Sequence, residues 1–117
     1  MAPTSEITSD DYSLRFDSDT ATVFCSGFLR LEGIAEYQPL KDLLLQAIET
    51  CPRLTVNLEG LEFLNSSGIS MLSMFVVKVR GRDDVSLKLL GSAKILWQTK
   101  SLRNLQRLMP GLGLELI

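Results

Sequence analysis

A chain of 117 residues is long enough for one continuous hydrophobic core and too short for two domains. Its hydrophobic content of 45% and charged content of 22% are those of a folded globular protein rather than a disordered one. The formal net charge of -2 argues against nucleic acid as the main partner, because nucleic-acid binding normally requires a basic surface.

The chain contains no histidine, which removes the commonest general base and the commonest zinc ligand. A serine-histidine-aspartate triad is therefore impossible, and the sequence has no G-x-x-x-x-G-K-[ST] or G-x-G-x-x-G phosphate loop. The two cysteines, Cys25 and Cys51, have neither metal-ligand nor redox spacing. We therefore expect no catalytic residue, no metal site and no cofactor.

The first residues, MAPTSEITSDDY, are polar and acidic, whereas a signal peptide would be basic and then apolar. No uninterrupted apolar run approaches the length of a membrane span. We expect a cytoplasmic protein without membrane insertion, in which residues 1–117 form one domain. Residues 1–11 are expected to be a mobile tail, part of which could extend the first strand.

Alternating apolar residues predict two strands at the start of the fold. The first covers residues 12–17 and the second residues 20–29, with a bulge or irregular end at Ser26-Gly27. Only a short turn separates them, so they are expected to form an antiparallel hairpin.

A loop over residues 30–36 then leads to the first predicted helix. Pro39 suits its first turn, where a missing amide costs nothing, and Pro52 ends the helix by Cys51. Apolar residues at helical spacing form its buried face: Tyr37, Leu40, Leu43, Leu44, Ala47 and Ile48.

The middle of the chain predicts a buried strand, a short loop and a second helix. The strand covers residues 54–58 and ends at Gly60, and the helix stops at Gly81. One face of this helix is expected to pack on the sheet through Ile69, Leu72, Val76 and Val79.

The last third predicts one more strand, a helix and a short closing strand. The strand over residues 85–91 is followed by Ser92, a plausible cap for a helix that runs to Met109 with a break near residues 99–101. The core residues expected in this region are Ile95, Leu96, Leu102, Leu105 and Leu108. The alternation of strands and helices predicts a single α/β domain with a mixed, mostly parallel sheet, an antiparallel hairpin at its start and covering helices.

The second helix begins at a polar turn, Asn65-Ser66-Ser67-Gly68. Asn65, Ser66 and Ser67 can each cap it, and the sequence does not decide which one does. A serine hydroxyl at the positive end of a helix is a favourable place for a phosphate. Most Ser-Ser-Gly turns before helices are caps without a regulatory role, and residue spacing alone favours that interpretation here.

Met71 and Met74 are expected on a partly exposed face of this helix. Methionine side chains adapt well to a partner, so both residues could border a docking surface that includes Ser67. The alternative is that they complete a wide apolar stripe of the core.

The run from Leu54 to Leu72 resembles the signature of the STAS domain, the fold of anti-sigma factor antagonists and of sulfate-transporter tails. The resemblance extends from about Tyr12 to Ile117 through the order of the elements. In that family the motif usually reads Asp-Ser-Ser-Gly or Asp-Ser-Thr-Gly, and a partner kinase phosphorylates its third residue. That residue corresponds to Ser67, while Asn65 stands in place of the usual aspartate.

The resemblance implies a non-catalytic regulatory domain that binds an anti-sigma factor, a serine kinase with a histidine-kinase-like ATPase fold. Phosphorylation at Ser67, with Ser66 as second choice, would end the binding. The contact surface implied in this way contains Asn65, Ser66, Ser67, Gly68, Met71 and Met74. The alternative is a constitutive scaffold or transporter-accessory subunit without a switch. An enzyme with Ser67 as nucleophile is disfavoured, because no histidine and no G-x-S-x-G elbow are present.

Overall fold

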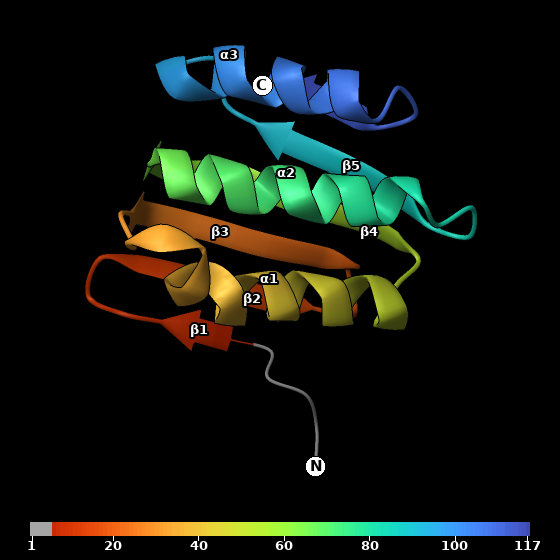
Figure 1. Cartoon of the computed structure of the whole chain (residues 1–117), viewed down its shortest axis with the longest axis horizontal. Coiled ribbons are helices and arrows are strands. Elements are labelled where there is room, and N and C mark those ends of the chain that lie inside the picture. Colours follow the sequence, from red (N-terminus) through yellow and green to blue (C-terminus); the bar gives the residue numbers. More distant parts are fainter. Residues whose placement is uncertain (1–5) are drawn as a thin grey trace.

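The strands of the sheet follow one another in the order of the chain (Figure 1). The computed structural model describes residues 6–117. The strands are β1 (Glu6–Thr8), β2 (Tyr12–Asp17), β3 (Thr22–Leu29), β4 (Arg53–Leu64), β5 (Ser86–Gly91) and β6 (Gly113–Leu116). The helices are α1 (Gly33–Thr50), α2 (Ser66–Arg80) and α3 (Leu96–Leu108).

The mode of strand pairing changes once along the sheet, from antiparallel to parallel. β1, β2 and β3 pair antiparallel, whereas β3, β4, β5 and β6 pair parallel. The three crossovers all advance in the same direction, and right-handed crossovers of this kind place their helices on one face. Figure 1 shows α1, α2 and α3 side by side in front of the sheet. The predicted mixed, mostly parallel α/β sheet with an opening hairpin is confirmed.

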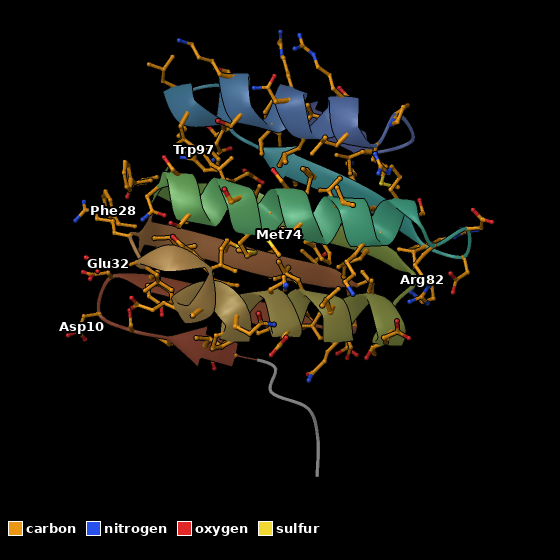
Figure 2. The ribbon with its side chains drawn as sticks, in the orientation of Figure 1. Asp10, Phe28, Glu32, Met74, Arg82 and Trp97 are labelled. Carbon is orange, nitrogen blue, oxygen red and sulfur yellow. The ribbon has the colours of Figure 1, made fainter. Side chains whose placement is uncertain are left out.

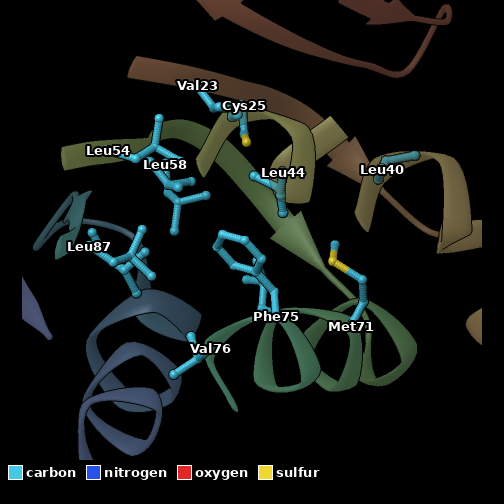
Figure 3. Close-up of a cluster of buried hydrophobic side chains, with 14 of the residues drawn as sticks. Val23, Cys25, Leu40, Leu44, Leu54, Leu58, Met71, Phe75, Val76 and Leu87 are labelled. Carbon is cyan, nitrogen blue, oxygen red and sulfur yellow. The ribbon is translucent and has the colours of Figure 1, made fainter. Parts of the chain in front are cut away.

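The core lies between the helices and the sheet. The buried face of α1 consists of the six residues that helical spacing predicted. On α2 the sequence analysis missed Phe75, which points from the helix towards the sheet and is among the largest fully buried side chains (Figure 3). The strands contribute alternate residues, among them Leu54, Leu58 and Leu87.

Two elements in the first half of the chain differ from the predictions. Glu6–Thr8, expected in the tail, pair with β2 as strand β1, and residues 1–5 lie outside the described part. α1 starts at Gly33, so Pro39 lies in its second turn and not its first. A proline there is unfavourable for a helix, and the burial of Tyr37 and Leu40 on either side of it compensates.

Strand β4 does not end at Gly60 but runs on to Leu64. β4 has more residues than the part of β3 that pairs with it, and two shifts in the register between the strands accommodate the difference. These shifts lie next to Ser26 and Gly27, where an irregularity was predicted. A glycine inside a strand therefore marks a bulge here and not a boundary.

Helix α3 also differs from its prediction. It is unbroken from Leu96 to Leu108, and its N-cap is Ile95 rather than Ser92. The Ser92 hydroxyl instead accepts a bond from the Lys94 amide in the preceding turn. Leu96, expected in the core, is 71% exposed because it stands at the first position of the helix, on its outer face.

Within residues 6–117 no helix is both long and apolar enough to cross a bilayer.

The two cysteines differ in accessibility, which makes them a test of the core. Cys25 is buried, and burial raises the pKa of its thiol to about 12, whereas the Cys51 side chain is half-buried. We expect a thiol-alkylating reagent at pH 8 to modify Cys51 alone in the folded protein, as read by peptide mass spectrometry. A Cys51→Ser variant should react only after unfolding in urea. Equal labelling of both cysteines in the native protein would contradict the buried position of β3.

Candidate functional site

The start of α2 is held by the side chain of Asn65, which makes three hydrogen bonds. Its Oδ1 accepts from the Gly68 amide at 3.0 Å and from the Tyr37 hydroxyl at 2.7 Å, and its Nδ2 donates to the Leu31 carbonyl at 2.8 Å. Asn65 is thus the N-cap, and it also joins α2 to α1 and to the loop after β3.

Tyr37 contributes its hydroxyl from inside the core. Its side chain is fully buried, and burial raises the pKa of this hydroxyl, so that it remains protonated and donates to Asn65 at physiological pH. The sequence placed Tyr37 on the buried face of α1 but gave no indication that it reaches the turn at residue 65.

Gly68 is required by close packing in the first turn of α2. A Cβ at this position would collide with the Leu64 side chain and would lie 2.8 Å from the Tyr37 hydroxyl oxygen. The glycine of the motif therefore allows α2 to approach the end of β4 and the Tyr37 ring. Gly68 is buried, so a partner would not contact it directly.

The two serines of the turn differ in exposure. Ser66 is exposed and Ser67 is half-buried, and neither hydroxyl hydrogen-bonds to another part of the described chain. The amides of Gly68 and Ile69 are already bonded to Asn65, whereas those of Ser66 and Ser67 are first-turn amides without an intrahelical acceptor. Free amides and the positive end of the helix dipole thus lie beside the Ser67 hydroxyl.

The two methionines occupy different environments. Met71 is 3% exposed and packs in the core, so the expectation that it lies on a partly exposed face is wrong (Figure 3). Met74 is 40% exposed and lies near the middle of α2 in the helix layer (Figure 2). Ser67, Ser70, Met74 and Val77 are spaced by three, four and three residues, which places them along one outward face of α2.

A second exposed group lies where β3 and β4 end. Phe28 and Phe63 are paired across the two strands, and the Arg30 guanidinium lies over both rings, 5.1 and 5.4 Å from their centroids. Both rings are exposed, and Figure 2 shows Phe28 at the edge of the molecule opposite Arg82. The sequence analysis missed this group, because the pairing depends on the irregular register of β4.

Within the described residues, no group of three or more histidine, cysteine, aspartate or glutamate side chains is arranged to hold a metal ion.

No protein-family model and no curated protein matches the sequence. Solved structures do match the fold. The crystal structure of the diguanylate cyclase SiaD in complex with its activator SiaC from Pseudomonas aeruginosa contains a chain that superposes with a TM-score of 0.69. The match covers 96% of this chain and 98% of that chain, at 14% sequence identity. The fold is STAS-like.

Two further structures support the same assignment. Apo-SiaC from Pseudomonas aeruginosa also gives a TM-score of 0.69, with 11% identity over 96% of this chain and 99% of that chain. A third structure, of SiaC from the same organism, gives a TM-score of 0.69 at 13% sequence identity. That match covers 96% of this chain and 95% of that chain. At these identities the likeness shows the STAS-like fold, and the resemblance noted in the sequence is confirmed at that level.

Proposed function

We propose that this chain is a non-catalytic regulatory protein that binds a protein partner through the outer face of α2, and that phosphorylation of Ser67 ends the binding. The observation that carries the proposal is the half-buried Ser67, whose hydroxyl bonds to no other part of the described chain, beside free first-turn amides at the start of α2. Ser66 is the second choice for the phosphate. The neighbouring SiaC is named as an activator of another protein, which supports a regulatory role.

The electrostatics of the turn favour a switch at Ser67. A phosphoserine adds a charge of about -1.5 to -2, which the helix dipole and the free amides would stabilise where it stands. The same charge would repel an acidic partner surface. Burying the phosphate in an interface would also cost free energy, because it would lose its hydration. Phosphorylation would thus leave the fold in place while it weakens the contact.

The turn is preformed without the aspartate that is usual in STAS motifs. Asn65 supplies the capping oxygen for Gly68 and also the donor for Leu31, and an ionised aspartate has no such donor. The substitution therefore maintains the geometry of the serines and removes one negative charge beside them.

Two classes of partner fit this surface. One is an anti-sigma factor that is also a serine kinase with a histidine-kinase-like ATPase fold, which the STAS motif implies. The other is an enzyme that the unphosphorylated chain activates, by analogy with SiaC and SiaD. In either class the proposal needs a kinase that recognises Ser67.

The proposal is tested with four baits in parallel pull-downs from the source cell extract: wild type, Ser67→Ala, Ser67→Asp and Ser86→Asp. We expect wild type and Ser67→Ala to retain the same partner and Ser67→Asp to retain at least about tenfold less of it. Ser86→Asp is the control for an added charge at an exposed serine outside α2, at the start of β5, and should retain the partner as wild type does. Equal recovery with all baits would mean that Ser67 is a helix residue without a switch, and would favour a constitutive scaffold or transporter-accessory subunit.

A further inference from the structure

The outer face of α2 opens onto an apolar groove. The groove has a volume of about 450 Å³ and is lined by Lys41, Ser73, Met74, Val77, Lys78 and Leu108. Met74 and Val77 are 40% and 42% exposed, and they form its apolar floor. All three helices contribute to this groove.

The rim of the groove carries uncompensated positive charge. Lys41 lies on the α1 side and Lys78 on α2, and within the described chain neither forms an ion pair, although Arg82 and Lys88 do. Lys78 also borders a second hollow between α1 and α2, where Asp42 and Glu49 lie together with Arg82, which forms an ion pair with Glu49. Carboxylates of a partner would be attracted to the Lys41 and Lys78 rim, because the lining of this groove contains no acidic side chain that opposes the two lysines.

We propose that this groove binds an acidic amphipathic helix of the partner protein, an inference that rests on the proposed function. Apolar side chains of that helix would cover Met74 and Val77, and its carboxylates would meet Lys41 and Lys78. Ser67 lies on the same face of α2, about 10 Å along the helix from Met74. A protein–protein interface of ordinary size is wide enough to cover both Ser67 and Met74.

The acidic character of the partner helix also explains why phosphorylation would weaken the binding and not strengthen it. A phosphate on Ser67 adds negative charge at the end of a surface that selects negative charge. Over a distance comparable with the Debye length, this repulsion is partly screened but still acts on the acidic helix. The groove therefore provides the anchor, and Ser67 modulates the affinity.

A second copy of this chain fits the groove less well. α1 carries acidic residues such as Asp42 and Glu49, but its apolar face is buried in its own core. α3 contains no acidic residue at all. No helix of the described chain thus offers an exposed apolar stripe flanked by carboxylates.

The test uses two synthetic helical peptides of about 18 residues, with leucines at helical spacing. In one peptide the positions that flank the leucines are glutamate, and in the matched peptide they are lysine. Each is titrated into the full chain with methyl-labelled methionine and valine, and NMR shifts are followed. We expect the glutamate peptide to shift the Met74 and Val77 methyl signals and to bind at least about tenfold more tightly than the lysine peptide.

Charge reversal provides the matched variants. In Lys41→Glu/Lys78→Glu the preference between the two peptides should invert, whereas Lys100→Glu, an exposed change on α3, should leave it unchanged. Equal affinity for both peptides, shifts located away from α2, or no shift at millimolar peptide would overturn the inference. Perturbation of Met74 and Val77 by self-association or by anionic phosphatidylserine vesicles in place of the peptide would also overturn it.

The outcome is separable from that of the proposed function. If the peptides show no preference while Ser67→Asp still releases the cellular partner, the switch stands and the groove is not its anchor. If the peptide preference holds while Ser67→Asp retains the partner, the groove stands and the switch is wrong.

Discussion

Replacing Gln98 with leucine should lower the free energy of unfolding by about 3–5 kcal/mol. Gln98 is fully buried between α3 and the sheet, and all its hydrogen-bonding groups are used. Its Nε2 donates to the Leu58 carbonyl at 2.6 Å and to the Leu61 carbonyl at 2.9 Å, while its Oε1 accepts from the Ser92 amide at 2.8 Å.

The large effect follows from what remains after the substitution. Leucine has nearly the same volume but no polar atom, so the Leu58 carbonyl and the Ser92 amide would lose the side chain that bonds them. The Leu61 carbonyl keeps one donor, the Trp97 indole N–H at 3.1 Å. An unsatisfied buried polar group costs about 1–3 kcal/mol, so the Leu58 carbonyl accounts for a large part of the expected loss, and the part-buried Ser92 amide and the other lost bond add to it.

Urea unfolding followed by far-ultraviolet circular dichroism measures this change. Gln106→Leu is the matched control on the same helix, because Gln106 is half-buried and donates one bond, to the Leu112 carbonyl at 3.2 Å. The control should lose about 1 kcal/mol or less. A Gln98→Leu protein within 1 kcal/mol of wild type would show that α3 is not held to β4 in this way.

The order of the elements could be predicted from the sequence because it depends on local pattern. The buried face of α1 was predicted completely, since Leu40, Leu43, Leu44 and their neighbours recur at the helical period. Boundaries were less predictable, because they depend on distant contacts. Pro39 in α1 and Gly60 in β4 are tolerated where packing and an irregular register compensate for them.

The polar contacts across the fold could not be predicted. Gln98 sits in a polar stretch of the sequence, and its carbonyl partners lie about forty residues earlier on a bulged strand. The position of the Arg30 guanidinium over two aromatic rings likewise requires the register that pairs Phe28 with Phe63. At the candidate site, the turn and its serines could be found from residue types, whereas the choice of Asn65 as cap required the structure.

Replacing Asn65 with alanine should lower the free energy of unfolding by about 2–4 kcal/mol. The substitution removes the cap of α2 and leaves the Tyr37 hydroxyl, the Leu31 carbonyl and the Gly68 amide without their partner. The Tyr37 hydroxyl is the costliest of the three to leave unpaired, because its side chain lies in the core.

Asn65→Asp separates the two roles of this side chain. Aspartate retains the acceptor for Gly68 and Tyr37 and interacts well with the helix dipole, but it cannot donate to Leu31 when ionised. We expect a smaller loss, about 1 kcal/mol, because one bond is exchanged for a repulsion between a carboxylate and a carbonyl oxygen. Urea unfolding of both variants, with Ser66→Ala as the control for an exposed change in the same turn, measures the difference.

A double-mutant cycle with Tyr37→Phe isolates the bond between Tyr37 and Asn65. If that bond carries part of the loss, the Asn65→Ala effect should be smaller by about 1 kcal/mol in the Tyr37→Phe background. Additive effects would mean that Asn65 acts as a helix cap alone. A coupling energy would show that the Tyr37 hydroxyl helps to fix the serine turn from the core, through α1.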